Sequence, residues 1–215
     1  MIKLGNVFIL GDSYSTFKNC IPEGFATYYW PERENCDVEK MEDTWWGIVV
    51  NSTDSHLVLN SSWSGTTICN TGYDKADYSD KSFIARFDKL IADGFFEQNK
   101  IDTFILFGGT NDCWAYSPMG EKVTHGWTKE QLYSFKPAFC YLIDKIRKTL
   151  PNTKLLSIIN TEFLPEFDNA IKTLSNELNV DTLVLKDIDK TAGHPTKKGM
   201  AQIAKQVLEY LAIHH

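Results

Sequence analysis

The chain has 215 residues, of which 43% are hydrophobic and 23% are charged, proportions typical of a globular protein with a buried core. The formal net charge is −6 at pH 7, and no basic stripe offsets it, which argues against a nucleic acid partner and against an anionic membrane surface. No apolar run approaches the roughly 20 residues that a membrane-spanning helix needs, so we expect no membrane insertion.

The amino terminus does not have the pattern of a secretory signal peptide, because Asp12 interrupts its short apolar run. The five cysteines are odd in number and contain no CxxC pair, which suits reduced thiols and indicates no zinc site. We therefore expect a cytoplasmic protein, unless a leader precedes the given sequence. No sequence feature indicates an oligomeric state.

Short apolar runs alternate with longer segments of helical periodicity. The apolar runs, which predict strands covered on both faces of a parallel sheet, are residues 7–10, 57–59, 103–107, 155–159 and 182–185. Helical spacing of apolar residues is found in residues 44–51, 82–92, 129–150, 167–178 and 197–213. This alternation predicts one α/β domain over residues 1–215, with helices on both faces of a five-stranded parallel sheet.

Residues 15–43 do not follow this alternation. The segment is rich in aromatic residues and is interrupted by Pro22 and Pro31. Loops of this length usually serve a function, such as a lid over a site or a wall beside it. An ordered excursion packed on the side of the domain is the alternative, and the sequence leaves both open.

Polar residues and glycines follow four of the predicted strands. In chain order these sets are Gly11-Asp12-Ser13, Asn60 to Gly65, Gly109-Thr110-Asn111-Asp112, and finally Asp187, Asp189 and His194. Ligands of open parallel sheets bind beyond the carboxyl ends of the strands. We therefore expect a hydroxyl, backbone amides, a carboxamide and an imidazole to meet at one edge of the sheet.

These groups are suited to acyl transfer. A serine hydroxyl becomes a good nucleophile when a histidine removes its proton, which predicts Ser13 as the nucleophile and His194 as its base. The backbone amides of Ser13 and Gly65 and the side chain of Asn111 are suitable oxyanion donors. Taken singly, each residue has an ordinary explanation, as a helix cap, a turn glycine or a surface loop residue.

Together the four blocks resemble the SGNH hydrolases, also called GDSL-type esterases, whose name refers to one Ser, Gly, Asn and His in separate blocks. The matching blocks here contain Ser13, Gly65, Asn111 and His194, in the family's order and over nearly the whole chain. The resemblance implies a three-layer α/β/α sandwich with a flavodoxin-like sheet. It also implies that Ser13 forms an acyl-enzyme, and that neither a metal nor an organic cofactor is needed.

One position departs from the family pattern. The acid that orients the histidine usually stands three residues before it, and here that residue is Thr191. Asp189 stands five residues before His194, and we predict that it takes the role of the acid in preference to Asp187. The alternative is a Ser–His dyad without an acid, as in family members that use a backbone carbonyl.

The predicted substrate is a small-molecule ester with a short acyl group, such as acetyl, carried by a carbohydrate. The aromatic side chains expected to bind it are Tyr28, Trp30, Trp63 and Trp114. Two alternatives stay open: a lysophospholipase or thioesterase of the same family, and a ligand-binding protein that keeps the scaffold without catalysis. A conventional α/β-hydrolase is disfavoured because no glycine follows Ser13 as in GxSxG. A dinucleotide-binding protein is disfavoured because GxGxxG is missing.

Overall fold

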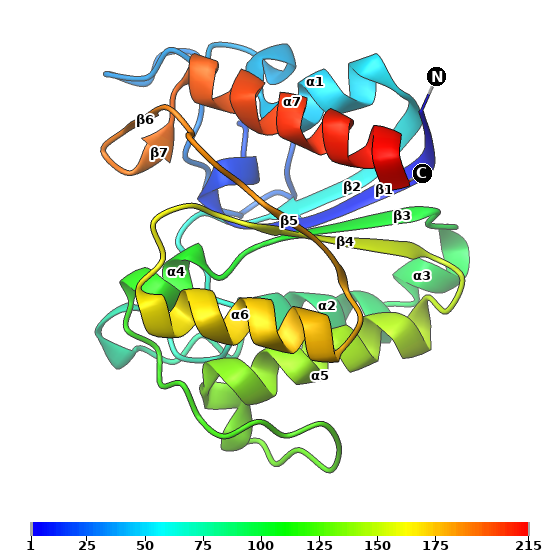
Figure 1. The fold of residues 1–215 in the computed structure, drawn as a ribbon, viewed down its shortest axis with the longest axis vertical. Coiled ribbons are helices and arrows are strands. Elements are labelled where there is room, and N and C mark those ends of the chain that lie inside the picture. The colour runs from blue at the N-terminus through cyan, green and yellow to red at the C-terminus, as the bar shows by residue number, and fades with distance from the viewer. Residues whose placement is uncertain (1, 215) are drawn as a thin grey trace.

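The computed structural model describes residues 2–214, and its centre is a five-stranded parallel sheet in the order β2-β1-β3-β4-β5 (Figure 1). The strands are β1 (Lys3–Gly11), β2 (Asp54–Ser62), β3 (Thr103–Phe107), β4 (Lys154–Ile159) and β5 (Asp181–Val184). This order is that of flavodoxin-like sheets, so the predicted fold class is confirmed. Strands β1 and β2 are longer than their apolar centres because polar residues at both ends still pair, as Lys3 does with Asp54.

Helices cover both faces of the sheet. Helices α1 (Trp45–Ser52) and α7 (Lys197–His214) lie on one face, and α2 (Phe83–Ala92), α5 (Phe135–Thr149) and α6 (Pro165–Glu177) lie on the other (Figure 1). Successive residues of a strand point to opposite faces. In β1, Val7 and Ile9 are buried in the core beneath α1 and α7, whereas Phe8 and Leu10 are buried in the core beneath the other three helices.

Two helices begin at positions that proline determines. The predicted helix 129–150 is divided into a 3-10 turn, η4 (Gln131–Tyr133), and α5, with an extended Ser134 between them. Proline lacks an N–H and is tolerated only in the first turn, so α5 begins two residues before Pro137. Helix α6 begins at Pro165 for the same reason.

Five short helices were not predicted, because they are too brief to show helical periodicity. They are the 3-10 turns η1 (Ser13–Ser15), η2 (Met41–Asp43) and η3 (Tyr73–Lys75) and the α-helices α3 (Phe95–Gln98) and α4 (Thr110–Trp114).

A small hairpin lies between β5 and α7. Its strands are β6 (Lys190–Thr191) and β7 (His194–Pro195), which pair in antiparallel fashion. The two connecting residues, Ala192 and Gly193, have φ values of 48° and 78°. Two consecutive residues with positive φ are the pattern of a type I′ turn, the connection that matches the twist of a two-residue hairpin. His194 is the first residue after this turn.

The aromatic-rich segment packs against this hairpin and against the start of α7. Tyr29 is buried and donates a hydrogen bond from its hydroxyl to the carbonyl of Pro195 at 2.9 Å. Asp37 accepts a hydrogen bond from the backbone N–H of Lys197 at 2.7 Å. The segment is therefore an ordered wall in this conformation, and its role as a lid stays a prediction.

Candidate active site

The strands β1, β2 and β3 end level with one another, because Gly11 pairs with Ser62 on one side and with Phe107 on the other. The loops that follow them therefore start side by side, at the left edge of the sheet in Figure 1, where α4 and the β6–β7 hairpin also lie. This edge contains all four of the sequence blocks that were expected to converge.

Ser13 directly follows β1 and opens η1. Asp12 caps this turn, since its carboxylate accepts a hydrogen bond from the backbone N–H of Tyr14 at 3.1 Å. Ser13 Oγ lies 2.9 Å from Nε2 of His194, within hydrogen-bond distance for a nucleophile and its base. The structure therefore brings together two residues that are 181 positions apart in the chain.

The second ring nitrogen of His194 faces a backbone carbonyl. Its Nδ1 lies 3.2 Å from the carbonyl oxygen of Ala192. A carbonyl only accepts hydrogen bonds, so Nδ1 carries the proton of the neutral ring, and Nε2 is free to accept the proton of Ser13. The type I′ turn, in which Ala192 is the first residue, thus selects the tautomer that a general base needs.

Burial lowers the pKa of His194 to about 4. The hydrogen bond to Ala192 opposes this shift, and the positive charges of Arg33 and Lys190 add to it. The imidazole is therefore neutral at pH 7 and ready to accept a proton.

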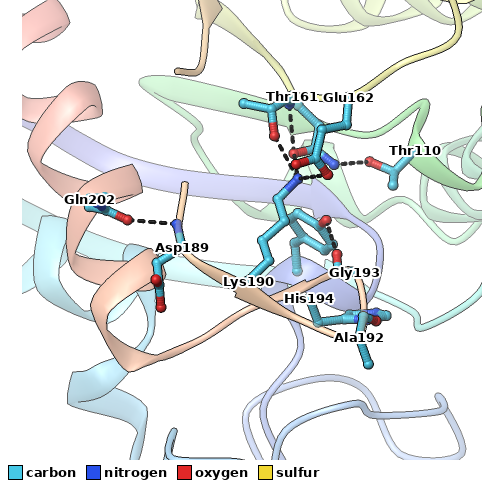
Figure 2. Close-up of polar contacts among 11 residues, drawn as sticks. Thr110, Thr161, Glu162, Asp189, Lys190, Ala192, Gly193, His194 and Gln202 are labelled. Atoms are coloured by element: carbon cyan, nitrogen blue, oxygen red, sulfur yellow. Dashed lines mark hydrogen bonds and ion pairs between the residues drawn. The ribbon is translucent and has the colours of Figure 1, made fainter. Parts of the chain in front are cut away.

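The prediction that Asp189 orients His194 is corrected by these contacts. The carboxylate of Asp189 accepts a hydrogen bond from the hydroxyl of Thr196 and lies 3.8 Å from Nζ of Lys198. Its backbone N–H donates to Gln202 of α7 at 2.7 Å, which keeps Asp189 on the α7 side of the hairpin, away from the imidazole (Figure 2). Because Asp189 precedes β6, the hairpin turn separates it from His194.

Lys190 anchors the hairpin to the end of β4. Its ammonium group donates to Asn160 Oδ1 at 3.2 Å, to Thr161 Oγ1 at 2.6 Å and to Glu162 Oε2 at 3.1 Å (Figure 2). The Lys190 side chain is only 7% exposed, and a buried ammonium needs such a set of acceptors. The hydroxyl of Tyr14 adds a second anchor by donating to the carbonyl of Gly193. Neither of these two anchors of the hairpin was predicted from the sequence.

The block of residues 109–112, which follows β3, supplies the carboxamide of Asn111 and the carboxylate of Asp112, and these two groups have different roles. Asn111 Nδ2 donates to the carbonyl of Thr66 at 3.0 Å, and its Oδ1 accepts from the hydroxyl of Tyr73 at 2.7 Å. The carboxylate of Asp112 accepts from the backbone N–H groups of Ile68 and Cys69. Burial raises the pKa of Asp112 to about 6, although these two donors oppose the shift. Asp112 therefore holds the loop after β2 against α4.

Gly65 lies in that same loop with a φ of +80°. A residue with a Cβ pays about 1–2 kcal/mol in the left-handed region, which explains the glycine in this block. The loop is tightly turned, since the N–H of Thr66 reaches the carbonyl of Trp63 at 3.4 Å.

Arg86 is a structural residue of the site that sequence reasoning missed. It is 4% exposed and donates to the carbonyls of Gly11 and Ser61 and to the hydroxyl of Thr66. It thus ties the ends of β1 and β2 to the glycine loop. A signal was available, because Arg86 stands beside Phe87 and three residues after Phe83, on the apolar side of a predicted amphipathic helix.

The four aromatic residues expected to bind substrate take different places. Tyr28 stacks on the ring of His194, with centroids 3.5 Å apart and planes 6° apart. Trp114 meets the same imidazole edge-on at 5.7 Å. Trp63 stacks on Phe25 at 4.2 Å. Trp30 lies beyond Tyr28, with the guanidinium of Arg33 near both rings. Two of the four therefore contact the catalytic candidate itself.

Residues 2–214 lack two features that would point to other functions. This part of the chain contains no group of three or more His, Cys, Asp or Glu side chains placed to hold a metal ion. It also contains no helix whose length and apolar character would let it cross a bilayer.

Comparison with known proteins identifies the family. The profile of the GDSL-like lipases and acylhydrolases matches residues 5–211. A search of curated proteins finds no match. Among solved structures, a protein described as a GDSL-like lipase from Bacteroides ovatus ATCC 8483 is 42% identical, with a TM-score of 0.91 over 98% of this chain and 99% of its own. A similar protein from Bacteroides uniformis ATCC 8492 is 40% identical, with a TM-score of 0.90 over 97% and 96%.

A more distant structure has the same fold. The acetyl xylan esterase Est2A from the rumen bacterium Butyrivibrio proteoclasticus is 16% identical, with a TM-score of 0.57 over 100% of this chain and 64% of its own. The family profile and the two Bacteroides structures cover nearly the whole chain. The chain belongs to the family of GDSL-like lipases and acylhydrolases.

Proposed function

We propose that this protein is a serine esterase that hydrolyses a short-chain acyl ester through an acyl-enzyme on Ser13. The observation that carries the proposal is the 2.9 Å contact between Ser13 Oγ and Nε2 of His194, in a ring whose Nδ1 faces the carbonyl of Ala192. A hydroxyl, a neutral base of the right tautomer and nearby amide donors are the parts that acyl transfer requires.

In the first half of the reaction, Nε2 of His194 takes the proton of Ser13 as Oγ bonds to the ester carbonyl carbon. The carbonyl oxygen becomes an oxyanion, which the backbone N–H groups of Ser13 and Gly65 and the side-chain amide of Asn111 stabilise. His194 then gives its proton to the leaving alcohol. In the second half, His194 takes a proton from a water molecule as the water oxygen bonds to the acyl carbon, and it gives this proton to Ser13 Oγ as the bond between the acyl carbon and Oγ breaks and the acid leaves.

In this mechanism Ala192 takes the place of the orienting acid. Its carbonyl fixes the tautomer but carries no full negative charge, so it stabilises the imidazolium less than a carboxylate does. The site therefore depends more on a pre-positioned ring. The stacking of Tyr28 on His194 and the two anchors of the hairpin support such positioning.

For the substrate, we propose an acetyl or similarly short ester on a carbohydrate. The aromatic rings of Trp63 and Trp114 near the site are suited to stacking on sugar rings, and the acetyl xylan esterase named above shares the fold. Tyr28 has His194 on one face and the guanidinium of Arg33 on the other, so it would meet the substrate through its edge or its hydroxyl. The proposal assigns Tyr28 and Trp114 a second role as contacts of the substrate, next to their contacts with His194.

The test combines a labelling reaction with a substrate series. A fluorophosphonate probe should label the wild-type protein quickly and leave the Ser13→Ala variant unlabelled, whereas a scaffold without catalysis would not react. p-Nitrophenyl esters of two, four, eight and twelve carbons, and acetylated xylo-oligosaccharides, then define the acyl group and the alcohol. Highest kcat/KM with the long chains would contradict the short-chain proposal, and unchanged activity in Ser13→Ala would refute the mechanism.

A further inference from the structure

Tyr73 lies in a loop that the sequence analysis left without a role. The loop is closed by an isolated antiparallel bridge between Thr71 and Asp77, and Tyr73 begins its 3-10 turn η3. The Tyr73 side chain is half-buried and reaches back to α4, where its hydroxyl lies 2.7 Å from Asn111 Oδ1. This contact joins the loop to the carboxamide of the proposed oxyanion hole.

A carboxamide is a useful oxyanion donor only when its nitrogen, and not its oxygen, faces the substrate. The two ends have nearly the same shape, so hydrogen bonds must distinguish them. Asn111 has two such bonds: Tyr73 donates to Oδ1, and Nδ2 donates one of its two protons to the carbonyl of Thr66. The second proton of Nδ2 is then the one offered to the oxyanion.

Removal of the Tyr73 hydroxyl would disturb this arrangement. Asn111 is only 2% exposed, so Oδ1 would lose its donor in a place with little access to water, which leaves a buried acceptor without a hydrogen bond. Rotation of the amide would satisfy Oδ1 elsewhere but would turn an acceptor toward the developing negative charge. Burial also raises the pKa of Tyr73 to about 12, so its hydroxyl keeps its proton at neutral pH.

We propose that Tyr73 is a positioning residue of the oxyanion hole, which fixes the orientation of the Asn111 side chain so that Nδ2 donates to the transition state. This inference rests on the esterase mechanism proposed above. Tyr73 acts through Asn111, so its effect should fall on kcat and leave KM nearly unchanged, because the oxyanion forms only in the transition state.

The test is a double-mutant cycle on a short-chain ester, with Tyr73→Phe, Asn111→Ala and the two combined. Loss of an oxyanion donor costs about 10²–10³-fold in kcat, and we expect Tyr73→Phe to cost about tenfold with KM within twofold. In the Asn111→Ala background, Tyr73→Phe should have no further effect. The inference is overturned if Tyr73→Phe stays within twofold of wild type, or if the two losses multiply in the double variant.

Tyr133→Phe is the matched control. Its hydroxyl donates to Asp77 at 3.0 Å and anchors the same loop without contacting Asn111. Its kcat should equal that of wild type, and an equal loss in both phenylalanine variants would assign the effect to loop stability alone and overturn the inference.

A measurement without substrate separates this inference from the proposed function. The side-chain amide signals of Asn111 in a ¹⁵N–¹H spectrum, assigned by their absence in Asn111→Ala, should shift in Tyr73→Phe and stay in place in Tyr133→Phe. If no ester is hydrolysed, the proposed function fails while the spectra still decide the positioning role. If Ser13-dependent hydrolysis is present and the amide signals do not shift, the positioning role alone is overturned.

Discussion

The pH dependence of activity follows from the environment of His194. A general base works only when it is neutral, and burial lowers the pKa of this imidazole to about 4. A histidine with the ordinary pKa of about 6.5 is roughly 3% neutral at pH 5, whereas one with a pKa of about 4 is roughly 90% neutral. Lowering the pH from 7 to 5 should therefore cost only about a tenth of kcat/KM through protonation of His194, while the carboxyl of Asp112, whose pKa is raised by burial to about 6, gains its proton over the same interval.

The assay measures kcat/KM on a short-chain ester from pH 3.5 to pH 8, with release of the acid as the readout, because p-nitrophenol itself titrates in this range. The charged groups that affect His194 are Arg33, beyond the ring of Tyr28, and Lys190, which is paired with Glu162. Arg33→Gln removes one cation that disfavours the imidazolium, so its acid limb should move to higher pH. Circular dichroism at each pH establishes that the fold persists. An acid limb near pH 6.5 in folded wild-type protein that moves to higher pH in Arg33→Gln would refute the reasoning, because that limb would belong to His194 and not to Asp112.

Three further predictions concern single residues. Asp189→Asn should keep kcat within about twofold of wild type and lower the unfolding free energy by about 1 kcal/mol, since its carboxylate bonds Thr196 and not His194; a loss near 10⁴-fold would restore it as the catalytic acid. Lys190→Met should lower both the Tm and kcat, because three acceptors lose their donor and the hairpin its anchor; an unchanged kcat in the folded variant would contradict this. Gly65→Ala should lower the unfolding free energy by about 1–2 kcal/mol and should change kcat more than KM, because alanine is strained at a positive φ. Thermal melts and steady-state kinetics measure both effects, and wild-type values in both would contradict this prediction.

The fold class was predictable because the pattern of apolar residues determines it. The predicted strand 103–107 has the same bounds as β3, since every side chain in it is buried and all but Thr103 are apolar. Residues 57–59 are only the centre of β2, whose ends are polar and pair with β1 through the backbone. Backbone pairing leaves no mark in hydrophobicity, so strand ends are poorly predicted.

The meeting of Ser13 and His194 was predictable from the rule that parallel strands present their carboxyl ends at one edge. The contact of His194 Nδ1 with the carbonyl of Ala192 was not predictable. Every residue has a backbone carbonyl, so the identity of Ala192 does not mark it as a partner of the imidazole. The turn that directs this carbonyl toward His194 spans only two residues, which is too short to leave a pattern in the sequence. Lys190 and Tyr73 were missed because their partners lie about 30 and 40 positions away in the chain, and spacing alone does not predict such contacts.

The separation of Ser13 and His194 along the chain has a consequence for synthesis and folding. Ser13, the proposed nucleophile, lies just after the end of β1, the first strand of the chain, and His194, its proposed base, lies on a hairpin that follows β5. A nascent chain emerging from the ribosome therefore carries an unactivated serine until His194, 181 positions further along, has been translated and docked. Hydrolysis by the proposed mechanism should accordingly appear only once the β6–β7 hairpin has docked beside Ser13, and it should be lost when this hairpin detaches.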